Sequence, residues 1–416
     1  MHKSKRGGLE NNLSNPFLHG VFLTKNQDQE QDKSSKEKKI MESDEMQNFI
    51  KVWLAVIISL CHCYAIRNII PIGIKRLLFV LPVVCLFLYL PINIFSPHLG
   101  GTTAFFIAWL ANFKLLLFAF GKGPLSADPS ISLPLFVAVS CLPIKIHKNP
   151  PPKTPLNHQN KENPPPKPYQ NGQTKETPSR KPREGPLNYA IKGILVAILV
   201  RVYDYSDYIH PKIIIVLYAF HVYFLLELTL AISAALARTM LGIELEPQFN
   251  EPYLSTSLQD FWGKRWNLMV TRILHPTVYE PTRNFCARVI GREWATLPAV
   301  FGTFVVSAVM HELMFYYLGR VRPTWDITTF FLLHGFCLTA EIALKKMIKD
   351  KWQLPGLLSG ILTVGFVMTT AFWLFFPKFM ECRIDVRAFE EYAALGAWVR
   401  NASESALRIW QGDRPA

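Results

Sequence analysis

The stretch Ser307-Ala308-Val309-Met310-His311-Glu312-Leu313-Met314-Phe315-Tyr316-Tyr317 places a histidine and a glutamate side by side among apolar residues. It lies near the end of an apolar run from Trp294 to Leu318, which is about long enough to cross a bilayer as a helix. Ionisable side chains at membrane depth are costly and usually functional, so His311 is the residue that most needs an explanation. Two other interpretations stay open for it: a histidine packed between helices, and a histidine at a water-exposed helix end.

The composition indicates the class of protein. Half of the 416 residues are hydrophobic and only 18% are charged, whereas soluble domains contain about 25% charged residues. The apolar residues gather in long runs, so we expect an all-α fold, a polytopic integral membrane helical bundle with about nine membrane segments. The formal net charge of +14 lies largely in hydrophilic segments between these runs, where the positive-inside rule accounts for it. Nucleic acid is therefore not an expected partner.

The third apolar run contains two strongly polar side chains, Asn112 and Lys114. We expect Lys114 to extend toward an interface with its charge in water; the alternatives are an acidic partner or a cavity. The absence of an internal repeat argues against a transporter built from inverted halves, which is the main rival from another functional class. The nine runs are residues 49–65, 77–95, 102–120, 131–146, 187–203, 213–237, 294–318, 327–344 and 357–376.

The segment between Arg238 and Trp294 interrupts the apolar runs. It is too long for a turn, and long ordered loops in compact proteins are usually functional. It contains Asp260-Phe261-Trp262-Gly263-Lys264-Arg265-Trp266-Asn267, in which two tryptophans four residues apart flank two basic residues. Such a composition is typical of a membrane interface and equally suits the recognition of phosphate groups.

This segment, followed by the Ser307–Glu312 stretch, resembles the membrane-bound O-acyltransferase family. Within that family the chain is most similar to the plant wax synthases, which are long-chain-alcohol O-fatty-acyltransferases. The likeness extends over roughly residues 41 to 395, and the order and spacing of its motifs make it specific. Besides the two stretches already quoted, the matching motifs are Ala111–Phe118, Glu244–Tyr253, Phe261–Tyr279 and Phe330–Gly335.

The resemblance implies that an asparagine in the basic, aromatic loop and a histidine inside the membrane form the active site. Here these are Asn267 and His311. Imidazole is well suited to remove a hydroxyl proton near neutral pH, so His311 is the expected general base. Asn267 would position the acyl donor or polarise its thioester carbonyl; the plainer alternative is that it only caps the backbone. Adjacent helical residues point about 100° apart, so Ser307 rather than Glu312 is the expected neighbour of His311.

The same resemblance implies a substrate-binding role for a further set of residues. Basic side chains in the loop would face the cytosol and attract the phosphates of coenzyme A, or simply reflect membrane topology. The tryptophans would line the acyl-donor entrance or sit at the interface. His334 is a second candidate histidine, for substrate binding or for helix packing, whereas His221 and His275 have no predicted role. The predicted substrate-binding residues are Trp262, Lys264, Arg265, Trp266, Arg272 and His334.

The expected reaction is the esterification of a long-chain alcohol by a fatty acyl-CoA to give a wax ester, and a sterol is the alternative acceptor. No metal or redox cofactor is implied, because acyl-CoA is a substrate. Membrane lipids are the remaining expected partners, and the family suggests the endoplasmic reticulum. Five regions follow: a disordered polar tail (residues 1–46), N-terminal membrane helices (47–146), a Pro/Lys-rich cytosolic loop (147–186), a catalytic membrane core (187–378) and a short amphipathic or disordered C-terminal tail (379–416).

Overall fold

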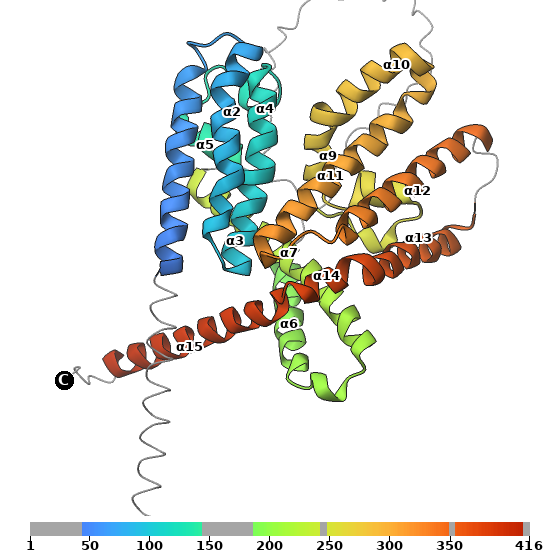
Figure 1. The fold of residues 1–416 in the computed structure, drawn as a ribbon. Helices are drawn as coiled ribbons and strands as arrows, with labels where there is room; N and C mark the ends of the chain where they lie inside the picture. The colour runs from blue at the N-terminus through green and yellow to red at the C-terminus, as the bar shows by residue number, and fades with distance from the viewer. Residues whose placement is uncertain (1–43, 144–185, 242–247, 349–353, 411–416) are drawn as a thin grey trace, which may run out of the picture.

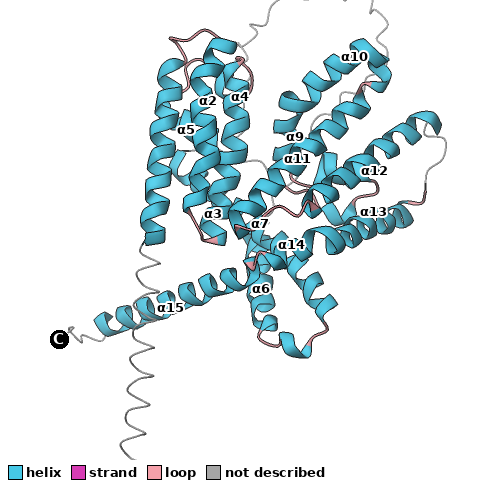
Figure 2. Cartoon of the chain, viewed as in Figure 1, coloured by secondary structure: helices cyan, strands magenta, loops and turns pink. Residues whose placement is uncertain are grey.

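The structure is a computed structural model, and it describes residues 44–143, 186–241, 248–348 and 354–410. Within these ranges every regular element is a helix (Figure 2), which confirms the predicted all-α class. The Pro/Lys-rich loop and all but the last few residues of the N-terminal tail lie outside the described residues, so the expectations for them remain predictions.

The N-terminal membrane helices form an upright bundle (Figure 1). Its interior is aromatic and aliphatic, and Phe87, Phe118 and Phe136 are at most 1% exposed. One long helix starts where the Ser96 side chain accepts a hydrogen bond from the backbone N–H of Leu99, at 3.0 Å, as N-cap serines do. The bundle contains Asp44–Ile66, α2 (Ile74–Tyr89), the continuous run of α3 (Pro97–Ala104), a π-helical segment (Phe105–Ala111) and α4 (Asn112–Ala119), and the short α5 (Leu133–Cys141).

Lys114 differs from the expectation that its charge reaches an interface. Its side chain is 4% exposed, and Nζ donates to the carbonyl oxygens of Val139 at 2.5 Å and Leu142 at 2.6 Å. The last carbonyls of a helix lack partners within the helix and carry partial negative charge, so a cation there is stabilising. Lys114 therefore caps the C-terminal end of α5, and the expected extension to an interface is wrong.

The remaining helices fan out beside this bundle (Figure 1). The helix that carries His311, α11, follows α10, which is kinked at Gly291, whose φ of +83° is strained for other residues. A second apolar core joins α11 to α12, with Phe304, Phe330 and Phe331 buried in it. These helices are α6 (Pro186–Tyr203), α7 (Pro211–Leu241), α10 (Glu280–Trp294), α11 (Thr296–Gly319), α12 (Asp326–Ile348), α13 (Gly356–Thr370), α14 (Phe376–Glu381) and α15 (Ile384–Trp410).

The end of α11 connects the two groups of helices. Tyr317 donates its hydroxyl proton to the carbonyl of Leu88 at 2.5 Å. Arg320 donates to the carbonyls of Pro91, Ile92 and Ile94 at 3.2, 2.6 and 3.1 Å. These contacts fix the C-terminal end of the His311 helix against the N-terminal bundle.

Seven helices among the described residues are long and apolar enough to cross a membrane, compared with the nine segments expected. Of the expected fourth run, residues 131–143 are described and contain the nine-residue α5, and α6 is not among the seven. The seven are Asp44–Ile66, Ile74–Asn93, Pro97–Ala119, Pro211–Leu236, Thr296–Gly319, Asp326–Ile348 and Gly356–Glu381.

Two further segments are more ordered than the sequence suggested. The expected loop after Arg238 contains, from residue 258 on, a series of short helices, α8 (Leu258–Asp260), a π-helical turn (Phe261–Arg265), α9 (Leu268–Leu274) and a second π-helical turn (His275–Tyr279). The expected C-terminal tail contains α15, a helix of 27 residues. Helix α15 packs against α3 and α14 at its start, so tertiary contacts stabilise a segment of mixed polarity.

Candidate active site

His311 lies on α11 inside an aromatic enclosure. Its ring stacks on Phe331 of α12, with centroids 4.0 Å apart and an interplanar angle of 27°. Trp109 of the N-terminal bundle meets the ring edge-on at 4.8 Å. These two contacts fix the position of the imidazole between the two groups of helices.

One hydrogen bond determines which nitrogen of His311 carries the proton. Nδ1 lies 2.7 Å from the backbone carbonyl oxygen of Ser307, one helical turn earlier. A carbonyl oxygen only accepts, so Nδ1 is the N–H of the neutral ring and Nε2 carries the lone pair. Nε2 has no hydrogen-bond partner among the described residues. The arrangement leaves a free imidazole base, oriented by its own helix.

Glu312 points away from this contact, as the helical geometry predicted. Its side chain is 7% exposed, and Oε1 accepts from the backbone N–H and the hydroxyl of Thr328, both at 3.1 Å. Thr328 lies in the first turn of α12, where N–H groups lack helical partners and a carboxylate is stabilising. Glu312 therefore attaches the start of α12 to α11, and Phe331 lies one turn further along α12. The feature of the sequence that could have indicated this role is the threonine in the first turn of the next helix.

Asn267 lies between the π-helical turn and α9 in a left-handed backbone conformation, with φ 42° and ψ 63°. Asparagine tolerates this region better than most residues. The flanking backbone is held by two bonds of 2.9 Å, from Leu268 N–H to the Gln248 carbonyl and from Asn250 N–H to the Arg265 carbonyl. Its side chain makes no cap hydrogen bond to α9, and its Oδ1 is buried without a partner. The plainer role of a side-chain cap therefore does not account for Asn267.

Trp262 and His334 bind each other. The Trp262 indole N–H donates to Nδ1 of His334 at 3.1 Å, so Nε2 carries the His334 proton and donates to the Thr370 hydroxyl at 2.8 Å. His334 is completely buried. Both nitrogens are thus occupied by protein groups, which is the arrangement of a helix-packing histidine; a contact with substrate stays a prediction. The Trp262 ring also lies 6.0 Å from Phe331, the residue that stacks on His311.

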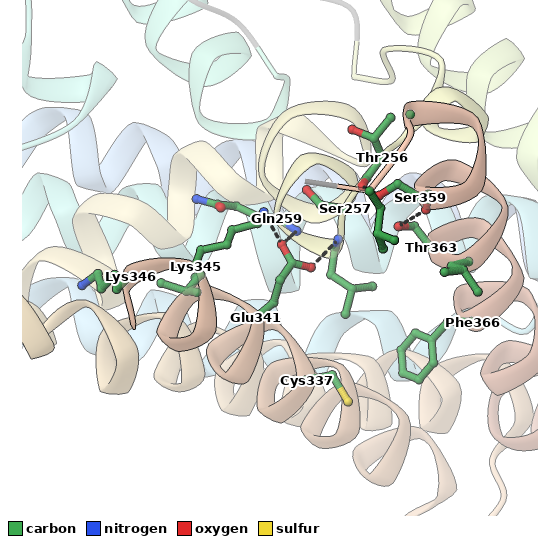
Figure 3. Close-up of a pocket in the computed structure, with 15 residues that line it drawn as sticks. Thr256, Ser257, Gln259, Cys337, Glu341, Lys345, Lys346, Ser359, Thr363 and Phe366 are labelled. Carbon is green, nitrogen blue, oxygen red and sulfur yellow. Dashed lines mark hydrogen bonds and ion pairs between the residues drawn. The ribbon is translucent and has the colours of Figure 1, made fainter. Parts of the chain in front are cut away.

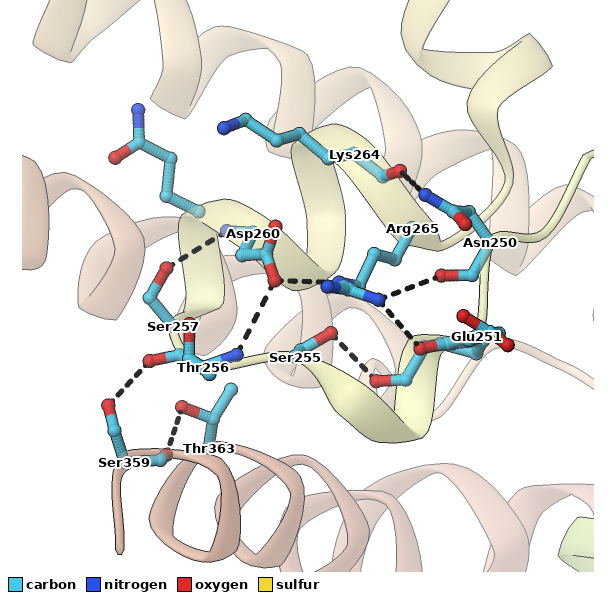
Figure 4. A network of polar contacts seen from close by, with 12 residues as sticks. Asn250, Glu251, Ser255, Thr256, Ser257, Asp260, Lys264, Arg265, Ser359 and Thr363 are labelled. Carbon is cyan, nitrogen blue, oxygen red and sulfur yellow. Dashed lines mark hydrogen bonds and ion pairs between the residues drawn. The ribbon is translucent and has the colours of Figure 1, made fainter. Parts of the chain in front are cut away.

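The basic residues of the loop have different environments (Figure 4). Arg265 donates from Nε to Asp260 Oδ2 at 2.7 Å, and from one terminal nitrogen to the carbonyls of Asn250 and Glu251, both at 3.2 Å. Its guanidinium thus serves to hold the loop, which differs from the expected exposed cation. Lys264 and Arg272 are exposed.

Trp266 completes the aromatic part of the loop. It stacks on Phe261 with centroids 5.6 Å apart and 12° between the rings, and it meets Phe249 edge-on at 5.1 Å. The ring therefore supports the backbone turn immediately before Asn267.

Asn267 and the neighbourhood of His311 share a small, mostly apolar cavity of about 270 Å³. Asn267 and Met314 both line it, and Met314 lies three residues after His311 on α11. No hydrogen bond joins Asn267 to His311 in the part of the chain that the structure describes. His311 itself does not line this cavity, so the cavity connects Asn267 with the helix that carries His311 and not with its ring.

A larger and more open cavity of about 1140 Å³ lies between α12, α13 and residues 256–259 (Figure 3). Glu341 lines this cavity and accepts hydrogen bonds from the backbone N–H groups of Leu258 at 2.8 Å and Gln259 at 3.4 Å. It also forms an ion pair with Lys345 at 2.7 Å. None of the eight site residues predicted from the sequence lines this cavity. The role of Glu341 is therefore to hold the residues that begin α8.

Comparisons with known proteins identify the chains that are similar to this one. Residues 245–333, which include Asn267 and His311, match the family described as "Membrane bound O-acyl transferase family". The chain is 52% identical to acyl-CoA–sterol O-acyltransferase 1 of Arabidopsis thaliana, over 85% of this chain and 96% of that protein. It is 44% identical to the long-chain-alcohol O-fatty-acyltransferase of Simmondsia chinensis, over 84% of this chain and 95% of that protein. A probable long-chain-alcohol O-fatty-acyltransferase 3 of Arabidopsis thaliana is 43% identical, over 83% and 94%.

Proposed function

Because the chain belongs to the membrane bound O-acyl transferase family, we propose that it transfers a fatty acyl group from acyl-CoA to the hydroxyl of a lipidic alcohol, with His311 as general base. The observation that carries this proposal is the 2.7 Å bond from His311 Nδ1 to the Ser307 carbonyl. It leaves Nε2 as the proton acceptor and needs no second residue to set the tautomer.

In this mechanism the acceptor hydroxyl gives its proton to Nε2 of His311 as its oxygen attacks the thioester carbonyl. The new C–O bond forms and the C–S bond breaks. The departing thiolate takes the proton back from the imidazolium, which yields an ester and free coenzyme A. General-base catalysis of this kind contributes about 10²–10⁴-fold in rate.

Asn267 supplies a hydrogen-bond donor for the developing oxyanion. An amide carries two N–H groups without a charge, and the Asn267 side chain makes no hydrogen bond to a described residue. A donor already oriented by a held backbone stabilises negative charge without further reorganisation. The strained left-handed backbone at Asn267 fits a position selected for orientation.

The exposed Lys264 and Arg272 attract the phosphates of acyl-CoA, and Trp262 and Trp266 line the approach of the acyl donor. Arg265 acts indirectly, through the loop conformation that its bonds to Asp260, Asn250 and Glu251 maintain.

The acceptor we propose first is a long-chain fatty alcohol, which would give a wax ester. A sterol is the second candidate, and the higher identity to a sterol acyltransferase, 52% against 44% for a long-chain-alcohol acyltransferase, favours it. We place the protein in the endoplasmic reticulum membrane, where an acyltransferase meets both lipid substrates.

Microsomes that express the chain, supplied with labelled acyl-CoA and either a long-chain alcohol or a sterol, test the proposal. We expect ester with at least one acceptor, and its identity decides between the two. The His311→Asn variant keeps a side-chain N–H for the Ser307 carbonyl but lacks the base, so its rate should fall about 10²–10⁴-fold. His275→Ala is the matched control, because this histidine is exposed on another segment. Absence of ester with every acceptor, or full activity of a folded His311→Asn protein, would contradict the proposal.

A further inference from the structure

A chain of hydrogen bonds links three helices at one end of the cavity that contains Asn267. His98 of α3 contacts the Glu391 carboxylate of α15 through Nδ1. Its Nε2 lies 3.0 Å from the Tyr392 hydroxyl, which in turn lies 3.1 Å from Nε2 of His221 on α7. Four polar side chains from distant parts of the sequence thus form one connected group.

The direction of these bonds follows from the donors available. A carboxylate only accepts, so His98 donates from Nδ1, and in the neutral form of the ring Nε2 then accepts. The Tyr392 hydroxyl therefore donates to His98, and its oxygen accepts the proton of His221 Nε2. The remaining nitrogen, His221 Nδ1, then carries a lone pair. It is buried and has no hydrogen-bond partner, and the residue as a whole is 6% exposed.

His98, His221 and Tyr392 all line the cavity of about 270 Å³ that Asn267 also lines. The other walls are mostly apolar and come from α3, α7, α11 and α15. An apolar cavity with a few polar groups is typical of a site for a small amphiphilic ligand. Within the described part of the chain, Asn267 Oδ1 and His221 Nδ1 are the two unpartnered buried polar atoms on its walls.

The cavity also approaches His311 from two helices. Phe105 lines it and packs against Trp109 at 6.1 Å, and Trp109 contacts the His311 ring. Met314 lines it one turn after His311 on α11. A lipid hydroxyl at His221 would thus lie in a cavity whose walls also include neighbours of the His311 helix turn.

We propose that this cavity is a docking site for a hydroxylated lipid, in which His221 Nδ1 accepts a hydrogen bond from the lipid hydroxyl. The site deepens the proposed function, on which it rests: it would hold the acceptor alcohol before its hydroxyl moves to His311. A lone pair that is buried without a donor is unfavourable, and a ligand hydroxyl removes that cost. Lipids that lack a hydroxyl proton, such as ethers, gain nothing from His221 and bind less tightly.

Binding of 1-hexadecanol and of its methyl ether, which cannot donate, tests the proposal directly. The two probes are compared on the full chain in nanodiscs, in the His311→Asn background so that no turnover occurs. We expect the alcohol to bind about 5-fold more tightly than the ether, the effect of one hydrogen bond. His221→Phe should abolish this preference, and Tyr392→Phe should reduce it by releasing the His221 ring. Thr229→Val, on the same helix and in the same cavity, is the matched control and should keep it.

Loss of the preference in His221→Phe but not in Thr229→Val supports the docking site. A wild-type-like preference in a folded His221→Phe protein overturns it, as does equal binding of the two probes before any substitution at His221. The nanodisc assay uses an inactive chain, so its result is independent of ester formation. A failure of the docking site is therefore distinguishable from a failure of the acyltransferase proposal.

Discussion

Thr370 provides the sharpest test of how His334 contributes to the site. Replacing it by valine keeps the shape of the side chain and removes only the hydroxyl that accepts from His334 Nε2 at 2.8 Å. The other ring nitrogen, Nδ1, accepts from the Trp262 indole N–H at 3.1 Å. The proton of the neutral ring therefore stays on Nε2, and without the Thr370 hydroxyl it has no acceptor. Thr370→Val therefore leaves one N–H unsatisfied in a completely buried ring.

The expected loss of stability in Thr370→Val follows from two typical ranges for the cost of losing a hydrogen bond. An orphaned buried donor costs about 1–3 kcal/mol in soluble proteins, while hydrogen bonds between membrane helices average about 0.6 and reach about 1.7 kcal/mol. Complete burial of His334 places this bond near the upper membrane value. We expect Thr370→Val to reduce the free energy of unfolding by about 1–2 kcal/mol.

Thr363→Val is the matched control on the same helix. Like Thr370, Thr363 is buried and donates to a carbonyl one turn earlier, that of Ser359 at 2.8 Å. It makes no bond to His334, so the difference between the two variants isolates that contact. Equilibrium unfolding in mixed micelles, followed by circular dichroism, measures both.

The same variants decide between the packing role of His334 and the substrate-binding role predicted from the sequence. A packing histidine predicts a stability loss for Thr370→Val with little change in KM for either substrate. Equal stability losses in the two threonine variants would refute the reasoning. A higher KM of Thr370→Val for either substrate, without a loss of stability, would also refute the reasoning and would favour a substrate-binding role for His334.

The other predictions concern the residues around the reacting groups. Asn267→Ala should lower kcat/KM about 10²–10³-fold and cost about 1 kcal/mol of stability, because alanine tolerates the left-handed backbone at this position less well than asparagine; a folded variant with full activity would contradict its proposed role. Glu312→Ala should cost about 1–3 kcal/mol of stability, because it leaves the Thr328 N–H unpaired. Glu312→Gln keeps an acceptor and should cost less. Equal losses for the two variants in the unfolding assay would argue against the contact with Thr328. Asp260→Asn should cost about 1–3 kcal/mol of stability, because the pair with Arg265 is only about one-fifth exposed and the change weakens a charge-assisted hydrogen bond; no loss would show that the backbone carbonyls hold the loop without the ion pair.

Hydropathy alone was enough to predict an all-helical membrane protein, because runs of about 20 apolar residues have few other stable conformations. Among the described residues seven helices are long and apolar enough to span, against about nine segments expected. Residues 131–146 are apolar, but the helix within them ends at Cys141, where Lys114 from another helix binds its last carbonyls. Whether a short apolar run is a span or a packed core helix depends on such contacts, which are not local in sequence.

Local geometry on α11 was predictable as well. The helical period placed Ser307 beside His311, and the structure confirms this neighbour, although the bonded atom is the backbone carbonyl and not the hydroxyl. The contacts of Arg265, by contrast, could not be predicted from the sequence. Its basic side chain suggested a phosphate contact, but the carbonyls of Asn250 and Glu251 that bind it are brought near by a fold of the loop that composition does not specify.

The role of Glu312 depends both on helical geometry, which the sequence predicts, and on a contact between two helices, which it does not. Its adjacency to His311 suggested a joint role, and helical geometry correctly separated them. Geometry on one helix did not identify its partner, since Thr328 belongs to the next helix. That bond fixes the start of α12 and hence Phe331, the ring that stacks on His311 at 4.0 Å. Glu312 thus affects the position of His311 through a second helix, which explains why a buried carboxylate next to this histidine need not contact it.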